Sequence, residues 1–265
     1  MNADKEEQLT KKRLWELAQT AAQKGINLYS DFLSLSEQAM FQELIGKLPP
    51  VLYALYGGTK EAERVCVGFL GSQPTIKAQK AALSPEEDAG FPIVCLKISV
   101  TDSRYAEHLS HRDYLGALLH LGISRSKLGD LYIKKEGAYL FCMASMKEFL
   151  CNELLQVKHT LVHCEEVIPE KETLAPTLHE FSGTVPSLRL DAILATAFSA
   201  SRSSLLAYIE AGKVFINGRL VTKPGTAVEE EDLLTVRGLG KAKLARINNT
   251  TKKGRISVLI QKYVS

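Results

Sequence analysis

The sequence predicts an α+β protein built in three parts, and three observations support this class. Residues 91–166 follow the order β-α-β-β-α-β, with apolar residues alternating in the strands and recurring at helical spacing between them. Residues from 187 onward give two short helices and then a hairpin with an Asn-Gly turn. Ahead of both lies a segment that also mixes helical and strand patterns, so no part is purely helical or purely β.

The first part, residues 1–80, is expected to be an α/β unit. Apolar residues at helical spacing predict a helix over 5–24, and Gly25 stands where a C-terminal cap belongs. A second helix is expected over about 34–46, ended by Pro49-Pro50. An apolar, strand-like run follows at 65–70.

The middle part, residues 81–167, is expected to be a ferredoxin-like (split βαβ) domain, because that fold has the order β-α-β-β-α-β. Helices are expected from Asp102 or Ser103 to about 121 and from the cap Ser145 to about 155. The expected strands are 91–100, about 128–134, 138–143 and 160–167. RNA-binding proteins, small-molecule binders and enzymes all use this order, so the fold does not decide function.

Residues 168–186 hold three of the nine prolines and Gly183, which favours a linker that is extended and partly packed. In the last part, 187–265, one helix covers about 190–198, and Ser199 or Ser201 caps a second that ends at Gly212. A hairpin turns at Asn217-Gly218, and a strand is expected at 233–237.

Composition places the chain among soluble globular proteins. Of 265 residues, 45% are hydrophobic and 24% charged, which argues against disordered, collagen-like and coiled-coil classes. No stretch approaches the roughly 18 apolar residues that span a bilayer. Five scattered cysteines without a C-x-x-C pair or an export signal indicate reduced thiols in the cytoplasm. His108 and His111 lack a third ligand at a suitable spacing, so no metal or cofactor is expected.

The basic residues are concentrated toward the C-terminus. Residues 181–265 hold 13 Lys and Arg against 6 Asp and Glu, whereas residues 1–180 hold 20 against 24. A basic third on a slightly acidic body favours a polyanionic partner, with nucleic acid as the leading candidate.

The C-terminal part closely resembles the RNA-binding domain of small-subunit ribosomal protein four, here called the S-four domain. This is an αL-type arrangement of two short helices plus a hairpin, with basic residues at the junctions. The matching segments are Arg189-Leu-Asp191, Ser201-Arg-Ser203, Gly212-Lys-Val214, Asn217-Gly218, Lys223-Pro224 and 232–238.

A second block in the middle part resembles the signature of the YlmH family of bacterial S-four proteins. It consists of His111-Arg-Asp-Tyr-Leu-Gly116, Leu121-Gly-Ile-Ser-Arg125 and Gly129-Asp130. The resemblance implies a cytoplasmic RNA-binding protein that associates with the large ribosomal subunit and takes part in rescue of stalled translation. Members are often encoded near cell-division genes. The chain departs from the family at Glu231, where glycine is usual, and at 238–241, where a more aromatic, arginine-bearing version is usual.

Arg202 is the central candidate for RNA binding, because it begins a helix whose free N–H groups suit a phosphate. A guanidinium there can contact phosphate with two hydrogen bonds. The alternative is that Ser201 only caps the helix and Arg202 is a solvated surface arginine. The candidate RNA-binding residues are Arg189, Ser201, Arg202, Ser203, Lys213, Asn217, Arg219, Lys223, Lys241 and Lys243, of which the last two fit a solvated tail nearly as well.

A possible second RNA surface comprises His111, Arg112 and Arg125. The structural alternative is that these side chains cap and orient the loop around Gly129-Asp130.

An enzyme is the less favoured interpretation. Arg189-Leu-Asp191 looks like the Arg-Leu-Asp of a pseudouridine synthase, but it opens the S-four domain and no synthase-sized domain remains. A methyltransferase would need a glycine-rich strand-to-helix turn, which the sequence lacks. We therefore expect no catalytic residues, and rRNA or tRNA on the large ribosomal subunit as partners. The alternatives are an rRNA-modifying enzyme that uses the S-four domain for targeting, and an adaptor that binds cell-division proteins.

Overall fold

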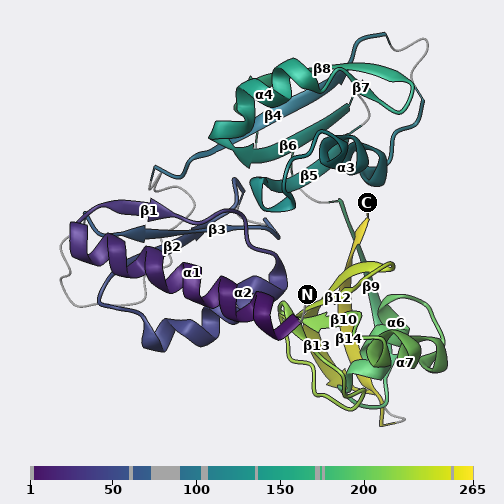
Figure 1. The fold of residues 1–265 in the computed structure, drawn as a ribbon. Coiled ribbons are helices and arrows are strands. Elements are labelled where there is room, and N and C mark those ends of the chain that lie inside the picture. Colours follow the sequence, from purple (N-terminus) through teal and green to yellow (C-terminus); the bar gives the residue numbers. More distant parts are fainter. Residues whose placement is uncertain are drawn as a thin grey trace. The chain divides into compact units, whose positions relative to one another are not determined.

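The computed structural model describes residues 3–59, 62–72, 90–102, 107–134, 137–170, 174, 177–251 and 254–264. The chain divides into two compact units, Met1–Ala175 and Pro176–Ser265 (Figure 1). Helices and strands mix within each unit, which confirms the predicted α+β class.

The first half of unit 1 packs two helices on a small sheet. Its elements are α1 (Ala3–Lys24), β1 (Asn27–Tyr29), α2 (Leu35–Leu44), the 3-10 turn η1 (Ile45–Lys47), β2 (Leu52–Tyr56) and β3 (Cys66–Leu70). Ser34 and Glu37 form a capping box that starts α2. The antiparallel sheet has the order β1-β3-β2. Leu14, Phe41 and Phe69 are fully buried where the helices meet it.

The second half of unit 1 has the ferredoxin-like arrangement. Its elements are β4 (Ile93–Val100), α3 (His111–His120), η3 (Arg125–Lys127), β5 (Leu128–Lys134), β6 (Gly137–Met143), η4 (Ala144–Met146), α4 (Lys147–Glu153), β7 (Gln156–Val157) and β8 (Thr160–Val167). The antiparallel sheet has the order β5-β6-β4-β8-β7. The first and third strands of the motif, β4 and β6, are therefore central, as the split βαβ topology requires.

The helix predicted from Asp102 or Ser103 begins later, at His111. Ser110 and Asp113 close a capping box at that point, which fixes the first turn. His108 precedes the helix, so it does not share a helix face with His111. Residues 103–106, and the predicted turn at residues 135–136, lie outside the described residues.

The two sheets of unit 1 share a buried apolar cluster. Phe32 and Cys66 enter it from the first half, and Cys95, Phe141 and Met143 from the second. Gly129 permits the close approach, because a Cβ there would lie 2.7 Å from the Phe32 ring. The expected parts 1–80 and 81–167 thus fall within one compact unit; the boundary expected at 80/81 lies outside the described residues.

Unit 2 is a six-stranded antiparallel sheet with two helices on one face. Its elements are β9 (Thr177–Val185), α6 (Leu190–Ala197), α7 (Arg202–Glu210), β10 (Val214–Ile216), β11 (Arg219–Leu220), β12 (Leu233–Val236), β13 (Gly240–Thr250) and β14 (Ile256–Val264). The sheet order is β11-β10-β12-β13-β14-β9. Leu194, Leu205 and Leu234 are fully buried between helices and sheet.

One expectation for unit 2 is corrected, and one alternative is excluded. The predicted linker 168–186 contains a strand, because β9 pairs with β14 along its whole length, from Thr177↔Val264 to Val185↔Ile256. In the sequence, Pro176 and Pro186 flank this strand, so neither removes a donor from its ladder. Lys241 and Lys243 lie on β13 within the sheet and are not part of a solvated tail.

Among the described residues no single helix has the length and apolar composition to cross a membrane. Helices α6 and α7 meet that test only when taken together, and they are bent by 116° relative to each other.

Candidate nucleic-acid interface

The start of α7 is an exposed polar helix terminus. The Ser201 hydroxyl accepts a hydrogen bond from the Ser204 amide at 3.1 Å, which is the predicted N-cap. Ser203 is linked to the cap through its own hydroxyl, 3.0 Å from that of Ser201. Arg202, the first helical residue, is exposed. The amides of Arg202 and Ser203 belong to the first turn, where N–H groups have no partner within the helix.

Arg189 lies next to the segment that contains Lys223. The Leu190 amide donates to the Thr226 carbonyl at 2.8 Å and the Asp191 amide to the Pro224 carbonyl at 3.1 Å, so this segment packs on the start of α6. The Arg189 guanidinium forms two hydrogen bonds to the buried Asp191 carboxylate. Part of its charge is therefore balanced within unit 2, while Lys223 is exposed.

Asn217 holds the hairpin to β12. Asn217 and Gly218 both have positive φ, 48° and 78°, as a tight two-residue turn requires. The Asn217 amide nitrogen donates to Asp232 at 2.6 Å, and its oxygen accepts from the Leu233 amide at 2.9 Å. The side chain thus has a structural role, whereas Arg219 beside it is exposed on β11.

Lys213 lies beside a basic residue that sequence reasoning missed, Arg237. The Arg237 amide donates to the Lys213 carbonyl at 2.9 Å. Each cation faces an aromatic ring, with Lys213 5.6 Å from the ring centre of Tyr208 and Arg237 4.7 Å from that of Phe215. Arg237 lies within the segment 232–238 that carries the S-four resemblance, and this position was the available signal.

Lys241 and Lys243 differ from the other candidates in being half-buried. Burial lowers the pKa of Lys241 to about 8. Lys243 forms an ion pair with Glu231, the residue that stands where the family has glycine. Glu231 adopts a φ of +73°, the left-handed backbone conformation that favours glycine.

The second predicted surface lies in unit 1. His111 and Arg112 lie at the start of α3 and are exposed. Partial desolvation of His111, together with the positive charge of Arg125, lowers the pKa of His111. Arg125 donates to the carbonyls of Leu128 and Gly129, at 2.7 and 3.1 Å. Arg125 therefore does orient the loop around Gly129-Asp130, as the structural alternative expects. A role in RNA binding stays a prediction for all three.

Comparisons with known proteins identify two domains. Residues 85–171 match the family described as "Putative RNA-binding domain in YlmH", and residues 188–234 match the S4 domain, the S-four domain above. The chain is 29% identical over 238 residues to the ribosome-associated protein quality control protein P2 of Bacillus subtilis (strain 168). This alignment covers 88% of this chain and 86% of that protein.

Among solved structures, the cell division protein ylmH from Streptococcus pneumoniae is similar at 19% identity and a TM-score of 0.48, covering 64% of this chain and 95% of that one. The two matched families are RNA-binding families and not enzyme families. The chain therefore carries a YlmH-type RNA-binding domain followed by an S4 domain, which confirms the resemblance to the YlmH family.

Proposed function

We propose that this protein is a non-catalytic, cytoplasmic RNA-binding protein that binds rRNA, or tRNA held on the ribosome, at the large subunit during quality control of stalled translation. The observation that carries the proposal is the exposed Arg202 at the capped start of α7, within the matched S4 domain. The ribosome-associated quality control protein that is similar over most of the chain supports the ribosomal partner.

The chemistry of this surface suits phosphate more than bases. A helix N-terminus offers free N–H groups and partial positive charge, and a guanidinium adds two directed donors. Arg219 and Lys223 are exposed on the same unit and add long-range attraction for a polyanion. Such contacts fix the orientation of a structured RNA and do not read its sequence.

The test is sedimentation of the purified chain with separated large and small ribosomal subunits and with tRNA, at several salt concentrations. The expected result is comigration with the large subunit that is lost in the Arg202→Ala, Arg219→Ala double variant. Arg246→Ala removes an exposed arginine from β13 of the same unit and is the matched control. Comigration that persists in the double variant, or binding to neither subunit nor tRNA, would overturn the proposal.

An rRNA-modifying enzyme would give a different result. Deletion of its gene would remove a modified nucleoside from rRNA, which mass analysis of digested rRNA detects. We expect an unchanged nucleoside profile. A cell-division adaptor would instead retain a protein partner after nuclease treatment, and we expect nuclease to release the protein from its complexes.

A further inference from the structure

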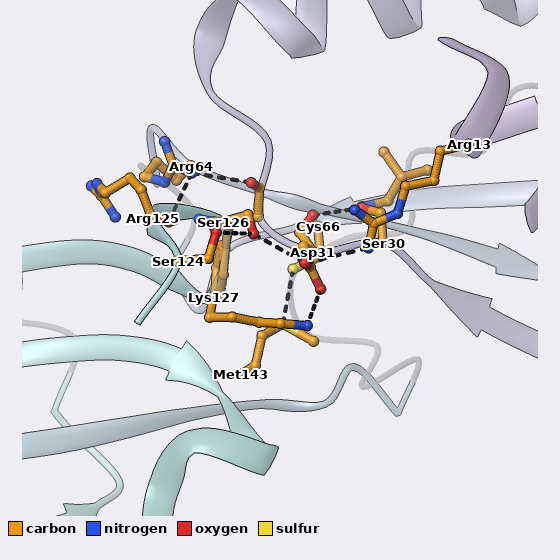
Figure 2. A network of polar contacts seen from close by, with 12 residues as sticks. Arg13, Ser30, Asp31, Arg64, Cys66, Ser124, Arg125, Ser126, Lys127 and Met143 are labelled. Carbon is orange, nitrogen blue, oxygen red and sulfur yellow. Dashed lines mark hydrogen bonds and ion pairs between the residues drawn. The ribbon is translucent and has the colours of Figure 1, made fainter. Parts of the chain in front are cut away.

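Two arginines lie together in unit 1, where the loop after α3 meets the start of β3 (Figure 2). The Arg64 guanidinium donates to three carbonyls, those of Leu128, Phe32 and Arg125, at 2.9, 3.1 and 3.2 Å. The Arg125 guanidinium also donates to the Leu128 carbonyl, so one backbone oxygen joins both side chains. These bonds hold both guanidinium groups in place.

The charge of this pair is not balanced by a direct ion pair. In the described parts of the chain, no carboxylate lies within 4.0 Å of either guanidinium. Glu37 and Asp130 attract Arg64, and Asp130 also attracts Arg125, but neither carboxylate forms an ion pair with them. The Asp130 carboxylate accepts instead from the backbone amides of Glu63 and Arg64, at 2.6 and 3.1 Å.

The neighbouring cations provide a contrast. Lys127 and Arg13 both reach the Asp31 carboxylate, at 2.7 and 3.4 Å (Figure 2). Burial lowers the pKa of Arg64 and takes that of Arg125 to about 10. An added anion would therefore stabilise the charged form of both arginines. Lys127 and Arg13, in contrast, already have an anionic partner in Asp31.

Both guanidinium groups keep donors for a ligand. An arginine has five N–H groups. Arg64 uses its Nε and Nη2 groups on carbonyls, and Arg125 uses its Nη1 group, so the Nη1 of Arg64 and the Nε and Nη2 of Arg125 have no protein acceptor in the described structure. Both side chains are half-buried and so remain accessible to solvent in part.

We propose that Arg64 and Arg125 form a second phosphate-binding site, which takes a backbone phosphate of the same RNA that the S4 domain binds. This inference rests on the proposed function for the identity of the RNA. Anchored, paired guanidinium forks match the oxygens of a phosphodiester, and little side-chain entropy is lost on binding because the carbonyls already hold them. The exposed Arg112 adds positive charge on the neighbouring helix α3.

The experiment compares the salt dependence of binding to purified large ribosomal subunits for the wild type, Arg125→Gln and Arg13→Gln. Each lost phosphate contact lowers the log–log slope by about 0.7–0.9. We expect that decrease, with weaker binding, for Arg125→Gln only. Arg13→Gln removes the same charge from the same unit at a position already paired with Asp31, so it serves as the matched control. Arg125→Lys should keep the slope and weaken binding, because it retains the charge and loses the fork.

A direct measurement covers the case in which Arg125→Gln fails to fold. The Nε–Hε resonances of the wild-type arginines are followed by NMR while inorganic phosphate replaces chloride at constant ionic strength. Saturable shifts of Arg64 and Arg125, without a shift of Arg13, support the site. Unmoved resonances, or a folded Arg125→Gln with an unchanged slope, would show that the two arginines only join the sheets.

The Arg202→Ala variant separates this inference from the proposed function. If Arg202→Ala binds normally and Arg125→Gln does not, the S4 site is wrong and the arginine pair stands. If Arg125→Gln binds normally and Arg202→Ala does not, the arginine pair is not a phosphate site and the S4 site stands.

Discussion

The guanidinium of Arg189 donates from Nε to Oδ1 of Asp191 at 3.0 Å, and from Nη2 to Oδ2 at 3.4 Å, across the first turn of α6. Arg189 is the N-cap residue of that helix and is half exposed, whereas Asp191 is only 7% exposed. The Arg-Leu-Asp segment therefore pairs internally, and its middle residue Leu190 is fully buried in the core.

Arg189→Ala is expected to destabilise unit 2 by about 1–2 kcal/mol, because it leaves a buried carboxylate without its charged donor. The value is modest since water partly screens the half-exposed guanidinium. Urea unfolding of the variant measures it. In a double-mutant cycle with Asp191→Asn, the two effects should be far from additive. Additive losses would mean that the pair contributes nothing.

Ser201 separates helix capping from RNA binding. Ser201→Ala removes the cap and should lower stability by about 1 kcal/mol, whereas Ser201→Asp keeps a capping oxygen and should retain it. The added carboxylate would repel phosphate at the start of α7, so Ser201→Asp should bind large subunits more weakly than Ser201→Ala. Thermal unfolding and sedimentation binding of both variants test this. Stronger binding by the aspartate variant would rule out a phosphate at this terminus.

Asn217 was predicted to bind RNA, but its amide makes two hydrogen bonds within unit 2. Asn217→Gly preserves the positive φ and removes those bonds, so we expect a loss of about 1–2 kcal/mol in unfolding free energy. The salt slope of RNA binding should stay that of the wild type. A lower slope in a variant of near wild-type stability would restore Asn217 as a direct RNA contact.

Asp130 predicts an unusual dependence of stability on pH. Burial raises its pKa to about 6, above the ordinary value of 3.8. Between these values the folded chain holds a proton that the unfolded chain releases, so stability falls as the pH rises from about 4 to 6, by at most about 3 kcal/mol.

In Asp130→Asn this contribution is absent. The unfolding free energy of the variant relative to the wild type should therefore increase between pH 4.5 and 7.0. Urea unfolding at the two pH values gives the comparison, in which other carboxylates cancel. A constant difference would show that Asp130 titrates near its ordinary pKa.

Local patterns predicted most elements, because periodicity and caps are encoded in adjacent residues. The strands Leu128–Lys134 and Thr160–Val167 have their predicted bounds, and Ser201 caps α7 as expected. The strand β9 was missed, since its partner β14 lies about 80 residues away and three prolines with Gly183 suggested a linker. The strands β13 and β14 were not predicted either. Pairings at that separation leave no local signal.

The same limit applies to the candidate site. Arg202 precedes the apolar residues of α7, and this order is visible in the sequence. The exposure of Arg202 could therefore be predicted. Arg64 and Arg125 belong to different halves of unit 1 and meet through backbone carbonyls. No sequence motif contains both residues, so the sequence does not predict that they are neighbours. Asn217 and Lys243 carry polar groups typical of RNA contacts, but three-dimensional neighbours already occupy them.

Glu231 shows what the departure from glycine changes. Its φ of +73° is strained for any residue with a Cβ, and its carboxylate pairs with Lys243. Glu231→Gly and Glu231→Ala both remove the ion pair, but only glycine relieves the backbone. The glycine variant should therefore be more stable than the alanine variant by about 1 kcal/mol in urea unfolding. Both variants also remove one negative charge from unit 2, so both should bind large ribosomal subunits more tightly at low salt than the wild type. Equal stabilities would place residue 231 outside the left-handed region, and unchanged binding by both variants would place Glu231 away from the RNA surface.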